Sequence, residues 1–374
     1  MCQLCGVSFA IARHRRADEP PSAAWDYTGS RYGSLILEAL FRETCRDTGS
    51  GCELLESESS TYQHIANPEC ASDNGYSGCR ISVEEMKGCR AVQVLVKKRE
   101  GWEPEDDDED FEIKSEYFLT GIGDGSPDCV PLEDLRPARH GIESIHIANV
   151  DCDYDWGLPF HPTCFQIFKR VSMLHLGNID VQGLWEWRQR DCTFEEFVGF
   201  PRNVAVRVAS EQRWRHEPGS EYLVANPVNI PGLQALLKRL WGGPGPEEVF
   251  RREAKNLENP SADPFTTLPT ETISMVVEYL SSEDIANLRL ATRAARELPT
   301  ILFRRLLLED MPWMWEAEDV PLGDVDWYKL YCTVKFGWVG LKGLMNRKRI
   351  WKDVEEIVRR IEKDRRSKRK MDSD

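Results

Sequence analysis

Cysteine and histidine side chains at two places in the chain have the residue types and spacing of a metal site. Cys2 and Cys5 form a Cys-x-x-Cys pair, and His161 and Cys164 form a second pair with the same spacing. Structural zinc takes four thiolate or imidazole ligands, commonly supplied as two close pairs that the fold brings together. The spacing predicts one structural zinc that joins the N-terminus to the body. The alternative interpretation is two ordinary turns that contain buried cysteine.

A looser group of cysteine and histidine residues contains no Cys-x-x-Cys pair. Its members are Cys45, Cys52, His64, Cys70, Cys79 and Cys89. Scattered cysteine behaves mostly as a small buried hydrophobe. We interpret this group as core, and a second metal site is the alternative.

Catalytic chemistry has little support in the sequence. His161 and Cys164 could act as a base and a nucleophile, but nothing near them supplies an orienting group or an oxyanion hole. The chain has no phosphate-binding glycine loop, no HExxH and no GxSxG, and the glycines at 121, 123 and 125 lack the dinucleotide-binding spacing. We therefore predict that the protein is not an enzyme.

The charge of the chain is unevenly distributed. Its 374 residues include 48 Lys and Arg against 63 Asp and Glu, a net charge of −15, yet residues 347–370 carry twelve basic and five acidic side chains. An acidic body repels phosphate backbones, so nucleic acid is an unlikely partner. We expect 362–374 to be a basic disordered tail. Two interpretations of the segment 363–370 stay open. It is a basic patch of the kind that binds import factors or nucleic acid, or it is a solvated tail.

The N-terminal residues do not have the order of a secretion signal, because the short apolar stretch comes before the basic cluster at 13–16. No apolar run approaches the roughly 18 to 20 residues that span a bilayer. Without an export signal, the twelve cysteines are best interpreted as reduced thiols or metal ligands. We expect a protein of the cytoplasm, the nucleus or both, with no membrane partner.

These candidate ligands need a scaffold, and the first 260 residues indicate a mixed one. Short strands are indicated at 91–96 and 116–123, and helices at 165–176 and 232–241. Two prolines in the segment 259–264 mark a break. The predicted fold class is α+β, with a cysteine-rich body of short strands and helices over 1–260.

Three short helices are predicted in the segment 263–310. Pro269 suits a helix start, and Ile273, Val276, Val277 and Leu280 then form one apolar stripe. A capping box at 281–284 begins the second helix, and a third follows Pro299. So much apolar surface on so short a segment predicts that part of it docks on something else. Residues 311–361, which are rich in tryptophan and end in a helix, are expected to pack on these helices.

The segment 263–310 resembles an F-box, through LPTE at 268–271, SEDI at 282–285, LRLATR at 288–293 and LFRR at 302–305. The flanks resemble filamentous-fungal F-box proteins with a cysteine-rich N-terminal region, through CQLCGV, FHPTCFQIF and GLMNRKRIWKDVEEI. The resemblance implies binding to a Skp-type adaptor, and through it to a cullin–RING ubiquitin ligase. The implied contacts are Leu268, Pro269, Ile273, Val276, Val277, Leu280, Ile285 and Leu288.

The sequence thus predicts a non-catalytic substrate receptor of a cullin–RING ubiquitin ligase. Its body would recognise an unknown target protein, and its F-box would bind the Skp-type adaptor. Similar Cys-x-x-Cys and Phe-His-x-x-Cys elements in the resembling proteins favour the zinc. The alternative is a metal-dependent regulator that binds nucleic acid through the basic tail.

Overall fold

The computed structural model divides into two compact units. Unit 1 comprises Met1–Ile230 and Lys342–Asp374, and unit 2 comprises Pro231–Leu341. The structure describes residues 1–25, 45–46, 49–56, 62–98, 100–124, 157–191, 200–211, 215, 217–241, 265, 268–292, 295, 298, 300–320, 325–336 and 340–371. Strands and helices are mixed in unit 1, which confirms the predicted α+β class.

An antiparallel sheet lies in unit 1 with strand β5 (Ala91–Lys97) at its centre. It pairs with β6 (Tyr117–Leu119), β7 (Gly123–Asp124) and β8 (Gly157–Phe160). Three valines and a leucine give β5 the β-branched and apolar character of a strand whose inner residues are buried. The strand predicted at 91–96 is present as β5, whereas the run at 116–123 contains β6 and the first residue of β7.

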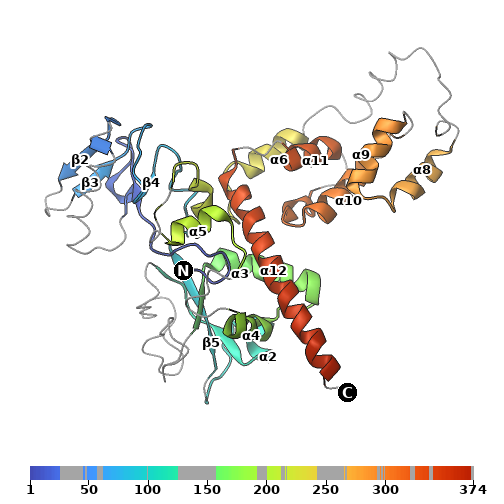
Figure 1. Cartoon of the computed structure of the whole chain (residues 1–374), viewed down its shortest axis with the longest axis horizontal. Coiled ribbons are helices and arrows are strands. Elements are labelled where there is room, and N and C mark those ends of the chain that lie inside the picture. The colour runs from blue at the N-terminus through green and yellow to red at the C-terminus, as the bar shows by residue number, and fades with distance from the viewer. Residues whose placement is uncertain are drawn as a thin grey trace, which may run out of the picture. The chain divides into compact units, whose positions relative to one another are not determined.

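Described helices of unit 1 follow and flank these strands in the chain. They are α2 (Asp110–Lys114), α3 (Pro162–Leu176), α4 (Val181–Asp191), α5 (Val204–Glu211), η6 (Glu221–Val224) and α12 (Lys342–Met371). Helix α12 contacts α3, α4 and η6. Figure 1 shows it crossing α3. Helix α3 has a proline at its first position and ends at Gly177, which has a left-handed backbone (φ 73°). Among the described residues, no helix is long and apolar enough to cross a membrane.

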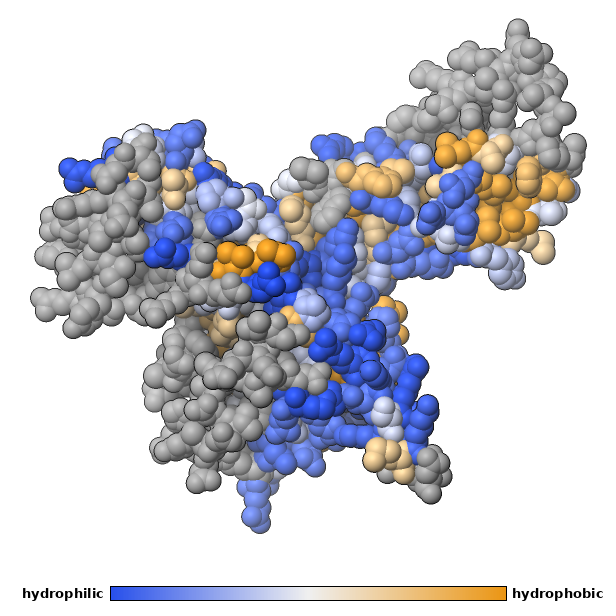
Figure 2. Space-filling model, viewed as in Figure 1, coloured by the Kyte–Doolittle hydropathy of each residue, from blue (hydrophilic) through white to orange (hydrophobic). Residues whose placement is uncertain are grey.

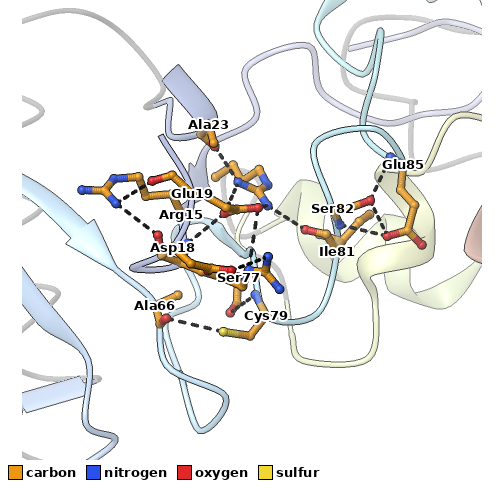
Figure 3. A network of polar contacts seen from close by, with 12 residues as sticks. Arg15, Asp18, Glu19, Ala23, Ala66, Ser77, Cys79, Ile81, Ser82 and Glu85 are labelled. Atoms are coloured by element: carbon orange, nitrogen blue, oxygen red, sulfur yellow. Dashed lines mark hydrogen bonds and ion pairs between the residues drawn. The ribbon is translucent and has the colours of Figure 1, made fainter. Parts of the chain in front are cut away.

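Two small sheets form the N-terminal part of unit 1. Strand β1 (Arg13–His14) pairs in parallel with β4 (Tyr76–Ser77), and β2 (Glu53–Glu56) forms an antiparallel hairpin with β3 (Tyr62–Ile65). A short 3-10 helix, η1, spans Pro21–Ala23. The buried guanidinium of Arg13 joins these parts, because it donates hydrogen bonds to the Glu19 carboxylate and to the carbonyls of Ala23 and Ile81. Figure 3 shows these three acceptors in one polar network.

Unit 2 is all helical in its described part. Its elements are α6 (Leu233–Trp241), α8 (Thr270–Val277), α9 (Ser282–Ala291), α10 (Thr300–Asp310), η9 (Trp315–Ala317) and α11 (Trp327–Phe336). The three helices predicted in 263–310 are α8, α9 and α10. The Ser281 hydroxyl accepts from the Asp284 amide, as the predicted cap requires. Phe303 of α10 packs edge-on against Tyr328 of α11, so the aromatic segment covers this helix.

The structure differs from the predicted domain boundaries at α12 and α6. We expected 342–361 to pack on the three-helix segment, but α12 belongs to unit 1, whereas α6 belongs to unit 2. Buried polar side chains explain the placement of α12. Arg347 donates to the Pro227 and Val228 carbonyls, and Asn346 donates to the Ala225 carbonyl. Such groups are costly to bury without these partners.

The prediction of a disordered tail at 362–374 is wrong for its described part, because α12 remains helical to Met371. Acidic side chains of unit 1 face the basic ones of the tail. Arg365 pairs with the buried Asp180 at 2.6 Å, and Lys368 pairs with Glu186 at 2.7 Å. These ion pairs hold the last turns of the helix, and they engage charges that a nucleic-acid surface would need.

Candidate metal centre

The four predicted ligands meet at the junction of the N-terminus, strand β8 and helix α3. Cys2 and Cys5 lie in the first turn of the chain. His161 directly follows β8 and caps α3, and Cys164 lies in the first turn of that helix. Their ligand atoms all lie within 4.8 Å of one another, and all four side chains are buried. The group can therefore hold a metal ion, as the spacing of the two pairs predicted.

The tautomer of His161 follows from its contacts. Nε2 lies 3.0 Å from the carbonyl oxygen of Cys89, which can only accept, so Nε2 carries the hydrogen. The lone pair of the neutral ring is then on Nδ1, which lies 3.5 Å from Cys5 Sγ and 3.7 Å from Cys164 Sγ. Metal-binding histidines are commonly oriented in this way by a hydrogen bond from the other ring nitrogen.

Two of the distances between donor atoms agree with the edges of a tetrahedral site. With metal–sulfur and metal–nitrogen bonds of about 2.3 and 2.05 Å, the edge between sulfur and nitrogen is about 3.6 Å. The distances from His161 Nδ1 to the sulfurs of Cys5 and Cys164, 3.5 and 3.7 Å, bracket that value.

Backbone amides point at the sulfurs of the same cluster. The amide of His161 donates to Cys2 Sγ at 3.4 Å, and that of Cys5 donates to the same sulfur at 3.5 Å. The Val7 amide donates to Cys5 Sγ at 3.5 Å. Hydrogen bonds of this kind favour the charged thiolate, which is the form that binds metal.

The protons of the cluster are strongly redistributed. Burial raises the pKa of Cys5, but hydrogen bonds with Cys164 and Cys2 and the charge of His161 bring it well below its usual value. Burial and its hydrogen bonds with Cys2 and Cys5 hold the pKa of Cys164 well above its usual value. Burial opposes the imidazolium, yet Cys2 and Cys5 outweigh it and raise the pKa of His161 to about 10. A bound cation would displace the protons that Cys164 and His161 hold.

Two buried arginines hold the turn that carries the cysteines. Arg202 donates to the carbonyls of Gln3 and Leu4, and Arg349 of α12 donates to the Cys5 carbonyl at 2.8 Å. Both also contact the Asp353 carboxylate, at 3.4 and 3.3 Å, and the three side chains are less than a tenth exposed. One buried carboxylate therefore faces two guanidinium groups beside the cluster.

A second group, Cys45, Cys52, His64 and Cys70, also has its ligand atoms within 4.8 Å of one another. The sequence pattern favours core for these residues, since no two cysteines there have the Cys-x-x-Cys spacing that signals a site. The other two members of the looser group lie outside it. The Cys79 thiol donates to the Ala66 carbonyl, and Cys89 offers its carbonyl to His161.

The residues predicted to bind the Skp-type adaptor divide between the interior and the surface of unit 2. Val277 and Ile285 are buried, and Ile273, Leu280 and Leu288 are half-buried. Leu268, Pro269 and Val276 are exposed.

Sequence reasoning missed Met275, Tyr279 and Leu290, which are 64%, 89% and 82% exposed. Positions 275, 276 and 279 have the three- and four-residue spacing of one helical face in the sequence. This signal could have identified Met275 and Tyr279. Figure 2 shows hydrophobic surface over helices α8–α10.

Comparison with known proteins gives one partial similarity. A 71-residue stretch is 37% identical to the ATP-dependent RNA helicase mss116, mitochondrial, of Aspergillus oryzae. The match covers 19% of this chain and 11% of that helicase. No family model matches the chain, and no solved structure matches it significantly.

Proposed function

We propose that this protein is a non-catalytic F-box adaptor, in which unit 2 binds a Skp-type adaptor protein and unit 1 binds a target protein. Such a protein would connect its target to a cullin–RING ubiquitin ligase in the cytoplasm or nucleus. The observation that carries the proposal is the exposed apolar surface of unit 2, formed by Leu268, Met275, Val276, Tyr279 and Leu290.

This surface is left over after unit 2 has packed its own helices. Val277 and Ile285 are turned inward, so the helices keep their arrangement without the outer side chains. Burial of one large apolar side chain contributes about 1.5–3 kcal/mol, so a partner that covers several of them gains substantial affinity. Hydrophobic surface that gathers in one region, as Figure 2 shows for these helices, marks interaction sites in soluble proteins.

The test is direct binding of the full chain to a purified Skp-type adaptor by calorimetry. Replacing Leu268 and Pro269 together by alanine should weaken binding about 30-fold, which corresponds to about 2 kcal/mol. The control is Ile301→Ala, because Ile301 is also an exposed apolar residue of unit 2 but lies on α10. Undiminished binding by the folded double variant would refute the proposal.

We also propose that the ion at Cys2, Cys5, His161 and Cys164 is a structural zinc. Four sulfur and nitrogen donors fill a tetrahedral shell, which is the arrangement of structural rather than catalytic zinc. Three thiolates and Zn²⁺ carry a net charge of −1. The guanidinium of Arg349, which donates to the Cys5 carbonyl at 2.8 Å, lies beside this negative charge and favours it.

Elemental analysis of protein purified without chelator tests this assignment. Cys164→Ser should lower the zinc content by about one ion per chain and lower the melting temperature, since metal binding and folding are linked. Cys89→Ser is the matched control, because its backbone carbonyl contacts His161 while its thiol lies outside the ligand set. Equal zinc content in Cys164→Ser and wild-type protein would refute the assignment.

A further inference from the structure

The second group of cysteines lies around the β2–β3 hairpin. Cys52 directly precedes β2, His64 lies on β3, and Cys70 follows in the next turn. Leu54 pairs with His64 in the hairpin, so this register brings the start of β2 and the end of β3 together. Cys45 comes from the segment before the hairpin. Three separate parts of the chain therefore converge on one point.

Two distances between donor atoms of this group also agree with the edges of a tetrahedral site. Cys45 Sγ lies 3.9 Å from Cys70 Sγ, and Cys70 Sγ lies 3.7 Å from His64 Nε2. The corresponding edges of a zinc tetrahedron are about 3.8 Å between two sulfurs and about 3.6 Å between sulfur and nitrogen. A disulfide would need its sulfurs about 2.0 Å apart.

A backbone amide points at a sulfur here too, because Asn67 donates to Cys52 Sγ at 3.4 Å. The same pattern surrounds the sulfurs of Cys2 and Cys5 in the first centre. Amides aimed at sulfur stabilise thiolates, which plain core cysteines do not need.

The ring of His64 is also held in place. It lies against the ring of His14, with centroids 4.0 Å apart. His14 is in turn held by contacts of its Nε2 with Ser72 Oγ and Asn74 Oδ1, at 3.0 and 3.2 Å. His64 therefore presents Nε2 to the cysteines in a fixed orientation, as a preformed ligand site requires.

The hairpin has little apolar material of its own. The buried cluster beneath it consists of Cys45, Ala66 and Cys70, with Cys52, Leu54 and Cys79 packed at its edge. An isolated two-stranded hairpin is marginally stable in water, and short side chains such as cysteine and alanine bury little surface. A metal bond network is the common means by which such small regions are stabilised.

We propose that Cys45, Cys52, His64 and Cys70 bind a second structural zinc ion, which holds the β2–β3 hairpin. This site shares no ligand with the first centre and does not depend on the proposed adaptor function. The protein then carries two zinc ions, and each contributes to the folding of a different part of unit 1.

Metal content of the full chain tests the proposal. The protein would be produced in zinc-supplemented medium, purified without chelator under reducing conditions, and analysed by inductively coupled plasma mass spectrometry. Wild type should hold two zinc ions per chain, Cys70→Ser one, Cys164→Ser one, and the double variant none. The matched control is Cys79→Ser, which should retain two. Cys79 lies at the edge of the same cluster, but its thiol donates to Ala66, as Figure 3 shows.

A second measurement covers the case in which Cys70→Ser does not fold. Wild-type protein would be treated with an alkylating reagent before and after zinc removal by a chelator, and each cysteine would be followed by peptide mass spectrometry. Cys45, Cys52 and Cys70 should become reactive only after zinc removal, while Cys332 of unit 2 should react equally in both states.

Three results would overturn the proposal. The first is a wild-type content of one zinc ion that only the Cys164→Ser variant loses. The second is equal zinc loss in Cys79→Ser and Cys70→Ser. The third is alkylation of Cys45, Cys52 and Cys70 that is the same with and without the chelator. Loss of zinc from Cys70→Ser but not from Cys164→Ser would instead refute the first centre and leave the second one supported.

Discussion

The buried ion pair between Arg13 and Glu19 gives the sharpest stability prediction. The Arg13 side chain is completely buried, and both of its terminal nitrogens bond to the Glu19 carboxylate, at 2.8 and 3.0 Å. In Glu19→Gln, the amide keeps one accepting oxygen, but its NH₂ group points a donor at a donor. The guanidinium then stays buried without a counter-charge.

The size of the effect follows from the burial of the pair. Removing one partner of a buried ion pair costs about 3–5 kcal/mol. Because 13% of the Glu19 side chain is exposed, we expect a value near the lower limit, about 3 kcal/mol. For a domain of 150–250 residues this lowers the melting temperature by about 6–12 °C.

Asp18→Asn is the matched control in the same loop. It removes the same charge from the same kind of pair, but Asp18 and its partner Arg16 are 70% and 45% exposed. An exposed pair contributes roughly 0–1 kcal/mol. Urea unfolding of wild type and both variants, followed by circular dichroism, measures the difference. Destabilisation of the two variants to within about 0.5 kcal/mol of each other would refute the reasoning, since that is the usual effect of a surface substitution.

The pH dependence of this difference has a definite sign. Burial raises the pKa of Glu19, but hydrogen bonds from Arg13 and from the Arg16 amide outweigh burial and hold the pKa below its ordinary value of 4.5. The stabilisation is therefore complete above pH 4.5 and is lost as the pH falls through the lowered pKa of the folded state. The gap between wild type and Glu19→Gln should shrink in that range, and a gap that widens on acidification would contradict the assignment.

Two further substitutions test the supports of the first centre and of α12. Gly6→Ala should destabilise the protein by well over the roughly 1 kcal/mol that a left-handed alanine costs, because a Cβ there would lie 2.6 Å from the Arg202 side chain. Gly101→Ala is the control, because Gly101 is also left-handed but has open space around it. Equal melting temperatures of the two variants would contradict this prediction. Arg365→Met should destabilise the protein by about 2–4 kcal/mol in urea unfolding, because it leaves a buried carboxylate unpaired, whereas Arg366→Met removes only an exposed pair and should change little.

Much of the local structure was determined by the sequence itself. The valine-rich run at 91–96 forms a strand because its side chains fit a buried pleated surface, and Ser281 begins a helix because its hydroxyl satisfies a free amide. Local structure also brings His161 and Cys164 together. His161 precedes α3 and Cys164 lies in its first turn, so their side chains face the same side. These signals lie within a few residues of one another.

Tertiary structure alone decided which distant groups meet. The chain spacing of Cys45, Cys52, His64 and Cys70 contains no metal signal. The register of the β2–β3 hairpin, together with the folding of the segments before and after it, brings them within 4.8 Å. The placement of α12 was equally hidden, because its amphipathic pattern fits any apolar partner. Its place in unit 1 depends on buried arginines that need particular backbone carbonyls, and those carbonyls come from segments more than a hundred residues away in the chain.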